Sequence, residues 1–169
     1  MRLEPLCHVT MTYGPDSSWQ RPFGTPDDPG EEEYGFGTGE GGVTGDVFKG
    51  SMRWANFPRR REDGVWTPDL RGYITADDGG ELIVSIRGLS IDETSPHPRR
   101  AIAGRLEFTT EHHPLKWLNT AFVVGEGEID ATTGVWWLDA FVCVNETVEY
   151  PPAIGSESPA RFRQGRQTT

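Results

Sequence analysis

The sequence has few cysteines and no long apolar run, and each absence narrows the range of functions. Its 169 residues include only Cys7 and Cys143, too few for the dense disulfide framework of a small secreted domain. No apolar run approaches the roughly 18 residues of a spanning helix, and the opening MRLEPLCHVTMTYG carries acid and proline where a signal peptide is apolar. We therefore expect a cytoplasmic protein with no membrane partner. The cysteines are typical of buried thiols, although a bridge between them stays open.

Basic residues are also scarce. The chain has 16 Lys and Arg against 26 Asp and Glu, which gives a formal net charge of −10. Such a charge repels nucleic-acid phosphates at long range. We therefore expect no nucleic-acid partner. The chain also lacks a P-loop, a dinucleotide-binding glycine fingerprint and a nucleophile elbow, so we expect no cofactor.

Glycine and proline are abundant, and they predict strands joined by turns. The 21 Gly and 13 Pro interrupt the chain too often for long helices. Apolar and polar residues alternate in seven segments: 6–13, 41–57 (which splits into two strands), 69–76, 81–89, 103–111, 116–130 and 134–146. This pattern predicts an all-β fold, a single antiparallel β-barrel of about seven to nine strands, with a β-sandwich as the alternative. We favour the barrel because closure removes exposed edges.

Turn residues mark two hairpins and the limits of the barrel. DDGG at 77–80 and DATTG at 130–134 supply the Asp and Gly that tight hairpins need. The barrel domain is predicted to span 1–149, with a C-terminal extension at 150–169. The segment 14–41 has no clear period and is predicted to form a long early loop that folds over the barrel mouth as a lid.

Polar side chains recur at every second position of the hairpin around residue 78. Asp69, Arg71 and Tyr73 share one face of a strand, opposite the aliphatic Leu70 and Ile74. In a barrel that holds a ligand, the polar face can line the interior. The alternative is that this face meets water and that its charges form ordinary surface ion pairs.

Several short motifs, taken in order, resemble the family known as domain of unknown function 3237. The matching positions are Asp69, Arg71, Tyr73, Asp77, Asp78, Gly79, Arg87, Gly88, Phe108, Thr109, Trp117, Leu118, Asn119, Phe122, Val123, Gly125 and Gly127. The resemblance covers about residues 3–146, apart from an insert at 14–37, and Gly72 between Arg71 and Tyr73 departs from the family pattern. It implies a small calycin-like barrel. Where members of this family have an activity, they act in fungal polyketide pathways. For this chain the resemblance therefore implies a cofactor-free cyclisation, in which a hydroxyl group adds across an alkene.

Such a cyclisation needs a proton donor, a sheltered cationic centre and groups that hold oxygen atoms. With the polar face inside, we predict Asp69 or Glu107 as the acid, with Arg71 as a further catalytic residue that, with Arg87, holds substrate oxygens. Four residues are predicted to shape the substrate pocket: Tyr73, Trp54, Trp117 and Asn119. The predicted function is a cofactor-independent cyclase of secondary metabolism that acts on a small aromatic polyketide-type substrate.

Other interpretations remain open. Trp54 and Trp117 are also typical of core residues, and Asn119 is typical of a side chain that satisfies buried backbone groups. The pair His112–His113 predicts no metal site, because adjacent side chains on a strand point in opposite directions. The rival functions are a non-catalytic barrel that carries a hydrophobic ligand, and a homo-oligomeric module that pairs through an apolar outer face.

Overall fold

A computed structural model describes residues 1–14, 33–93, 99–130 and 132–146. The elements are β1 (Arg2–Tyr13), β2 (Glu33–Tyr34), β3 (Gly37–Thr44), β4 (Gly50–Asn56), β5 (Arg59–Arg60), β6 (Trp66–Thr67), β7 (Asp69–Ala76), β8 (Glu81–Glu93), β9 (Arg99–Thr109), the 3-10 helix η1 (His113–Thr120), β10 (Val123–Asp130) and β11 (Val135–Val144). Most of the predicted lid and the whole predicted C-terminal extension lie outside the described residues.

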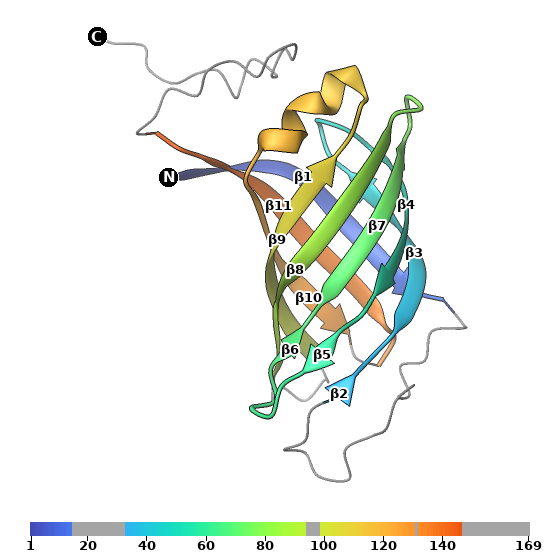
Figure 1. The fold of residues 1–169 in the computed structure, drawn as a ribbon, viewed down its shortest axis with the longest axis vertical. Helices are drawn as coiled ribbons and strands as arrows, with labels where there is room; N and C mark the ends of the chain where they lie inside the picture. Colours follow the sequence, from blue (N-terminus) through green and yellow to red (C-terminus); the bar gives the residue numbers. More distant parts are fainter. Residues whose placement is uncertain (15–32, 94–98, 131, 147–169) are drawn as a thin grey trace.

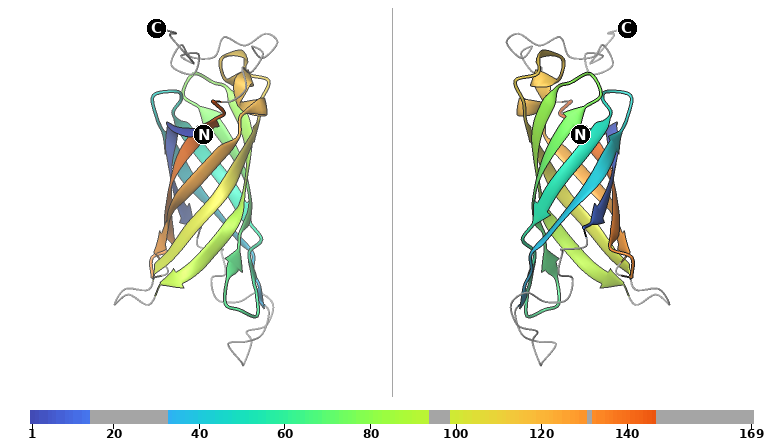
Figure 2. Two further views of the ribbon diagram at one scale, coloured as in Figure 1. Left: turned by 90° about the vertical axis from the view of Figure 1, so that its left-hand side faces the viewer. Right: turned by 90° about the vertical axis from the view of Figure 1, so that its right-hand side faces the viewer.

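Eight of the strands form a closed antiparallel barrel, which confirms the predicted fold class (Figure 1). The strands follow one another around the barrel in the order β1, β3, β4, β7, β8, β9, β10 and β11, and β11 pairs again with β1. The strands cross the barrel axis obliquely (Figure 2), as closure of a twisted sheet requires. No helix in the described part of the chain is long and apolar enough to cross a bilayer.

The apolar side chains point into the barrel and form its hydrophobic core. On β7, Leu70 and Ile74 are almost fully buried, whereas Arg71 between them is exposed, and β8 repeats this alternation with Ile86 and Arg87. The prediction that the polar face of this hairpin lines the interior is therefore wrong. An eight-stranded barrel is just wide enough for side chains to fill its interior or to hold one small ligand, and burying a row of charges there would cost far more free energy than burying aliphatic groups.

The two predicted hairpins are present. Gly79 (φ 87°) lies in the turn between β7 and β8, and Gly134 (φ 70°) lies in the turn between β10 and β11. Both adopt the left-handed backbone that only glycine accepts without strain. Oδ1 of Asp130 accepts hydrogen bonds from the backbone N–H groups of Thr132 and Thr133, which fixes the second turn.

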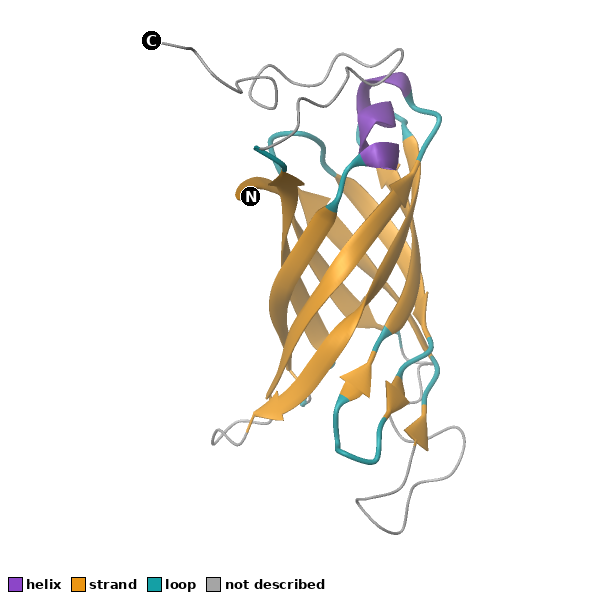
Figure 3. Cartoon of the chain, turned by 60° about the vertical axis from the view of Figure 1, so that its left-hand side comes forward, coloured by secondary structure: helices purple, strands orange, loops and turns teal. Residues whose placement is uncertain are grey.

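Helix η1 covers one end of the barrel, where a strand had been predicted (Figure 3). The predicted strand 116–130 is wrong in its first part, since η1 ends at Thr120 and β10 begins at Val123. Pro114 lies in the first turn of η1, where its missing N–H costs nothing and its fixed φ suits a helix. The buried side chains of η1 are Leu115, Trp117 and Leu118.

At the opposite end, β2, β5 and β6 form a small extension beside β8 (Figure 1). The predicted loop 14–41 is also wrong in its last part, because β2 and the start of β3 lie within it. The sequence of β3, GTGEGGVT, has little intrinsic strand preference, since glycine has no side chain to pack.

Candidate functional site

The charged residues predicted for the site meet on the outer face of the barrel. Asp69 Oδ1 lies 3.0 Å from Nε of Arg87 and 3.4 Å from Nε of Arg71. The side chain of Asp69 is 42% exposed, and that of Arg87 is 59% exposed. These residues therefore form the surface ion pairs that were the alternative to an inward-facing site.

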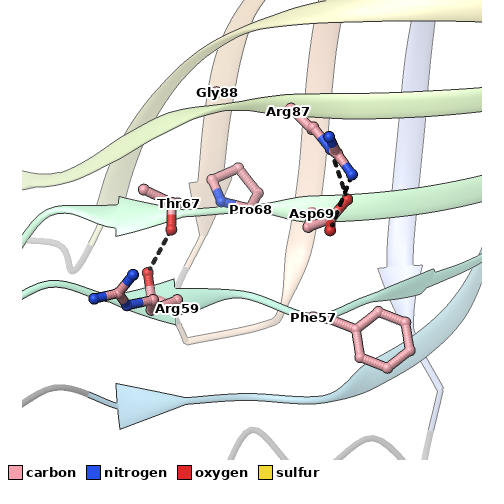
Figure 4. A pocket seen from close by; sticks show the side chains of 7 residues that line it. All are labelled: Phe57, Arg59, Thr67, Pro68, Asp69, Arg87 and Gly88. Atoms are coloured by element: carbon pink, nitrogen blue, oxygen red, sulfur yellow. Dashed lines mark hydrogen bonds and ion pairs between the residues drawn. The ribbon is translucent and has the colours of Figure 1, made fainter.

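A surface pocket of about 330 Å³ lies beside this ion pair (Figure 4). Its lining residues are Phe57, Arg59, Thr67, Pro68, Asp69, Arg87 and Gly88. In Figure 4 the Asp69 carboxylate and the Arg87 guanidinium point toward each other, and the Thr67 hydroxyl donates to the backbone carbonyl of Arg59 (3.1 Å). The carboxylate is in contact with water, so this pocket lacks the desolvation on which its predicted role as a proton donor depends.

Glu107 and Tyr73 also lie on the outside. Glu107 is half exposed and pairs with Arg105 (2.7 Å). The Tyr73 ring lies beneath the guanidinium of Arg53, and a hydrogen bond with Glu81 is the main cause that raises the pKa of the Tyr73 phenol. Neither side chain reaches the interior.

Trp117 and Asn119 belong to η1, at the end of the barrel that this helix covers. Oδ1 of Asn119 accepts from the backbone N–H of Thr110 (2.8 Å), and Nδ2 donates to the carbonyl of the same residue (2.9 Å). This bidentate contact confirms the interpretation of Asn119 as a side chain that satisfies backbone groups. Trp117 is 7% exposed and belongs to the core.

Trp54 is the one predicted pocket residue that the structure places among other chemically useful groups. It belongs to an aromatic–polar cluster at the end of the barrel where β1 and β4 end and β9 and β11 begin. The aromatic–polar cluster consists of Tyr13, Trp54, Asn56, Trp66, Ser90, Arg100 and Trp136. The Tyr13 ring lies 4.6 Å from that of Trp54 and 5.5 Å from that of Trp136, between centroids.

Glycines of β3 make room for these rings. A Cβ atom on Gly37 would lie 2.3 Å from the Tyr13 ring, and one on Gly39 would lie 2.5 Å from the Trp54 ring. Real Cβ atoms do not approach neighbours so closely. Gly37 and Gly39, which weaken the strand pattern of β3 in the sequence, therefore make room for the aromatic–polar cluster.

Asn56 holds the Tyr13 hydroxyl in a defined way. Oδ1 of Asn56 accepts a hydrogen bond from the backbone N–H of Asp69 (3.2 Å), so the amide must present Nδ2 to Tyr13, whose oxygen it meets at 3.2 Å. Asn56 is 1% exposed. Because the phenol oxygen accepts from Asn56, its own proton is directed to another group.

The electrostatics of Tyr13 combine opposing effects. Burial raises the pKa of the Tyr13 phenol well above its usual range, and this is the largest effect. The hydrogen bond from Asn56 and the positive charge of Arg100 act in the opposite direction, because both favour the phenolate. Tyr13 is thus a neutral phenol at neutral pH, with two groups in place to stabilise the negative charge left when its proton departs.

Arg100 and Trp66 lie at the rim of the aromatic–polar cluster. The guanidinium carbon of Arg100 lies 4.4 Å from the centroid of the Trp66 ring, and Nε lies 2.5 Å from Oδ1 of Asp92. The Arg100 side chain is 18% exposed, which is low for an arginine. The stacking and the ion pair hold its charge near the barrel interior.

Three buried donors of the aromatic–polar cluster have no hydrogen-bond partner among the residues that the structure describes. They are Nε1 of Trp66, Oγ of Ser90 and Nε1 of Trp136. Ser90 is 2% exposed and Trp136 is 1% exposed. In the same part of the chain, no three His, Cys, Asp or Glu side chains come together as a metal ion would require.

The members of the aromatic–polar cluster other than Trp54 were missed because the polar face of the hairpin around residue 78 was taken as the inner one, so site residues were sought among side chains that point outward. On β4, Met52, Trp54 and Asn56 share the inner face, and on β1 Tyr13 follows Met11 at a spacing of two. On these strands every second residue is apolar and points inward, and the last residue of that series is polar. A polar residue in that last position is the signal that would have identified the site.

Comparison with known proteins supports the fold. No family model matches the chain, and no curated protein matches it. A β-barrel-like protein from Acinetobacter baumannii is 20% identical with a TM-score of 0.66, over 83% of this chain and 94% of that one. A protein of unknown function from Clostridium acetobutylicum is 17% identical with a TM-score of 0.69, over 83% and 97%. An enzyme from Penicillium herquei is 20% identical with a TM-score of 0.61, over 83% and 92%. At these identities the likeness shows the shared barrel fold.

Proposed function

We propose that this protein is a cofactor-independent cyclase of secondary metabolism that adds a hydroxyl group across an alkene in a small aromatic polyketide-type molecule. The observation that carries the proposal is the neutral Tyr13 phenol, held by Asn56 against the rings of Trp54 and Trp136, which also contact each other. The resemblance to domain of unknown function 3237 supports it, as does the barrel shared with an enzyme from Penicillium herquei. The aromatic–polar cluster takes the place of the outward-facing Asp69 and Arg71 as the site.

The reaction is an isomerisation and needs no external reactant. Tyr13 gives its proton to one alkene carbon, the substrate hydroxyl oxygen bonds to the other, and the hydroxyl proton returns to Tyr13. One C–H and one C–O bond form, while the O–H bond and the π bond break. Trp54 and Trp136 face the developing carbocation and stabilise it by about 0.5–2 kcal/mol each. Asn56 and Arg100 stabilise the transient phenolate.

The test uses an ortho-butenyl phenol in heavy water. The proposal predicts a cyclic ether enriched in one enantiomer, with one deuteron on carbon, because the transferred proton comes from an exchangeable phenol. Tyr13→Phe keeps the ring but removes the donor, and should lower kcat about 100-fold or more without weakening binding. The matched control is Tyr34→Phe, which removes the same hydroxyl from an exposed ring on β2.

The rival function gives a different result. A carrier barrel would bind the phenol, quench tryptophan fluorescence and release it unchanged. Binding without any enzyme-dependent ether would overturn the cyclase proposal. Equal kcat values for the wild type and Tyr13→Phe would remove Tyr13 from the mechanism.

A further inference from the structure

The unpartnered donors of the aromatic–polar cluster carry information about its ligand. Buried N–H and O–H groups in folded proteins are nearly always hydrogen bonded, to protein, to ordered water or to a ligand. Leaving such a group unsatisfied costs the free energy of removing it from water without any compensating hydrogen bond. Trp136 and Ser90 are both at least 98% buried, yet neither donor finds a partner among the described residues.

These donors come from different walls of the barrel. Trp136 lies on β11, paired with Met11 of β1, whereas Ser90 lies on β8, paired with Trp66 of β6. Nε1 of Trp66 is the third unpartnered donor. The indole N–H groups can only donate, so their partners must be acceptors.

The one cation among the residues of the aromatic–polar cluster already has an acidic partner. Nε of Arg100 lies 2.5 Å from Oδ1 of Asp92. An anionic ligand would have to compete with Asp92 for Arg100, and it would enter a protein whose net charge is −10. A neutral acceptor has no such competitor at Trp136 or Ser90.

We infer that the aromatic–polar cluster recognises a flat, uncharged ring system bearing carbonyl-type oxygens, and that Trp136 and Ser90 donate to those oxygens. This inference rests on the proposed small-molecule function of the same cluster and names the chemistry of its ligand. The rings of Tyr13, Trp54 and Trp136 supply flat apolar faces, which contact a ring system with little loss of conformational entropy.

Three probes of similar size test it: chromone, which is neutral and carries a ring carbonyl; naphthalene, which has no acceptor; and chromone carboxylate, which is an anion. Tryptophan fluorescence titration of the full chain gives each Kd. We expect chromone to bind about tenfold more tightly than either of the others, the factor for one buried hydrogen bond. Equal binding of chromone and naphthalene would overturn the inference, and so would tighter binding of the carboxylate.

Variants identify the donors. Trp136→Phe and Ser90→Ala should each weaken chromone binding about fivefold or more, and Ser90→Ala, which keeps every ring of the cluster, should leave naphthalene binding unchanged. The matched control is Trp137→Phe on the outer face of β11, where the side chain is 36% exposed. If both Trp136→Phe and Ser90→Ala retain the full preference for chromone, ordered water satisfies the donors and the inference is wrong.

The outcomes separate this inference from the proposed cyclase. Preference for chromone without conversion of the butenyl phenol would sustain the recognition chemistry and reject the reaction. Conversion of the phenol without any preference for chromone would do the reverse.

Discussion

At the scale of single residues, Asp69 pairs with Arg87 on the outer face of the barrel, because the aliphatic side chains of the same strand are buried inside it. The alternation of Asp69, Arg71 and Tyr73 with aliphatic residues separates two faces without identifying the inner one. The choice depends on whether the barrel is wide enough to enclose water or a ligand, a property of strand number and tilt that no single strand encodes. The apolar side chains occupy the interior, so the charges lie outside.

This placement predicts a mild phenotype for Asp69→Asn. Exposed ion pairs contribute about 0–1 kcal/mol, and the variant retains the backbone N–H that fixes Asn56. The free energy of unfolding, from urea denaturation, should fall by less than about 1 kcal/mol, and kcat with the butenyl phenol should stay within about twofold. A large loss of kcat in a stable Asp69→Asn protein would instead place the chemistry in the outer pocket.

Strands and turns can be predicted from the sequence where the local residues favour the conformation that the fold requires. In β3 the local residues do not favour a strand. The two hairpins follow from local turn residues, which act within a few positions. Gly37 and Gly39 of β3 are explained by Tyr13 and Trp54, which lie on other strands and need the space that a Cβ atom would fill. Such long-range complementarity is invisible to a local pattern.

Substitutions within β3 test this explanation. A Cβ on Gly39 would lie 2.1 Å from the carbonyl oxygen of Thr12 and 2.5 Å from the Trp54 ring, so Gly39→Ala should destabilise the protein by about 1–3 kcal/mol. On the same strand, a Cβ on Gly42 meets nothing nearer than 3.8 Å, and Gly42→Ala should be neutral or slightly stabilising. Urea denaturation measures both. Equal stabilities would show that the glycines are not needed for packing.

The whole molecule depends on closure between the two ends of the described chain. β1 pairs with β11 in one direction and with β3 in the other, so no strand of the barrel has a free edge. The sequence predicts a closed barrel in general terms, because closure protects edges, but not which strands meet. Which strands pair depends on the contacts of all eight strands together. Strands in such a ring can separate only when two ladders break, which makes opening cooperative.

Cys7 reports on this cooperativity. It lies on β1 and is 8% exposed, and burial, together with the negative charge of Asp139, raises the pKa of its thiol to about 12. At pH 8 only about one Cys7 side chain in ten thousand is a thiolate, the reactive form, and the thiolate increases only as the pH rises toward that pKa. In Cys143→Ala, where Cys7 is the single thiol, a disulfide reagent should modify the native protein no faster than it unfolds globally, as followed by circular dichroism in urea. The matched variant Cys7→Ala retains Cys143, which is partly exposed and should react without unfolding. Rapid modification of Cys7 in native buffer would show that β1 leaves the barrel locally, and the closed ring would then not be a single cooperative unit.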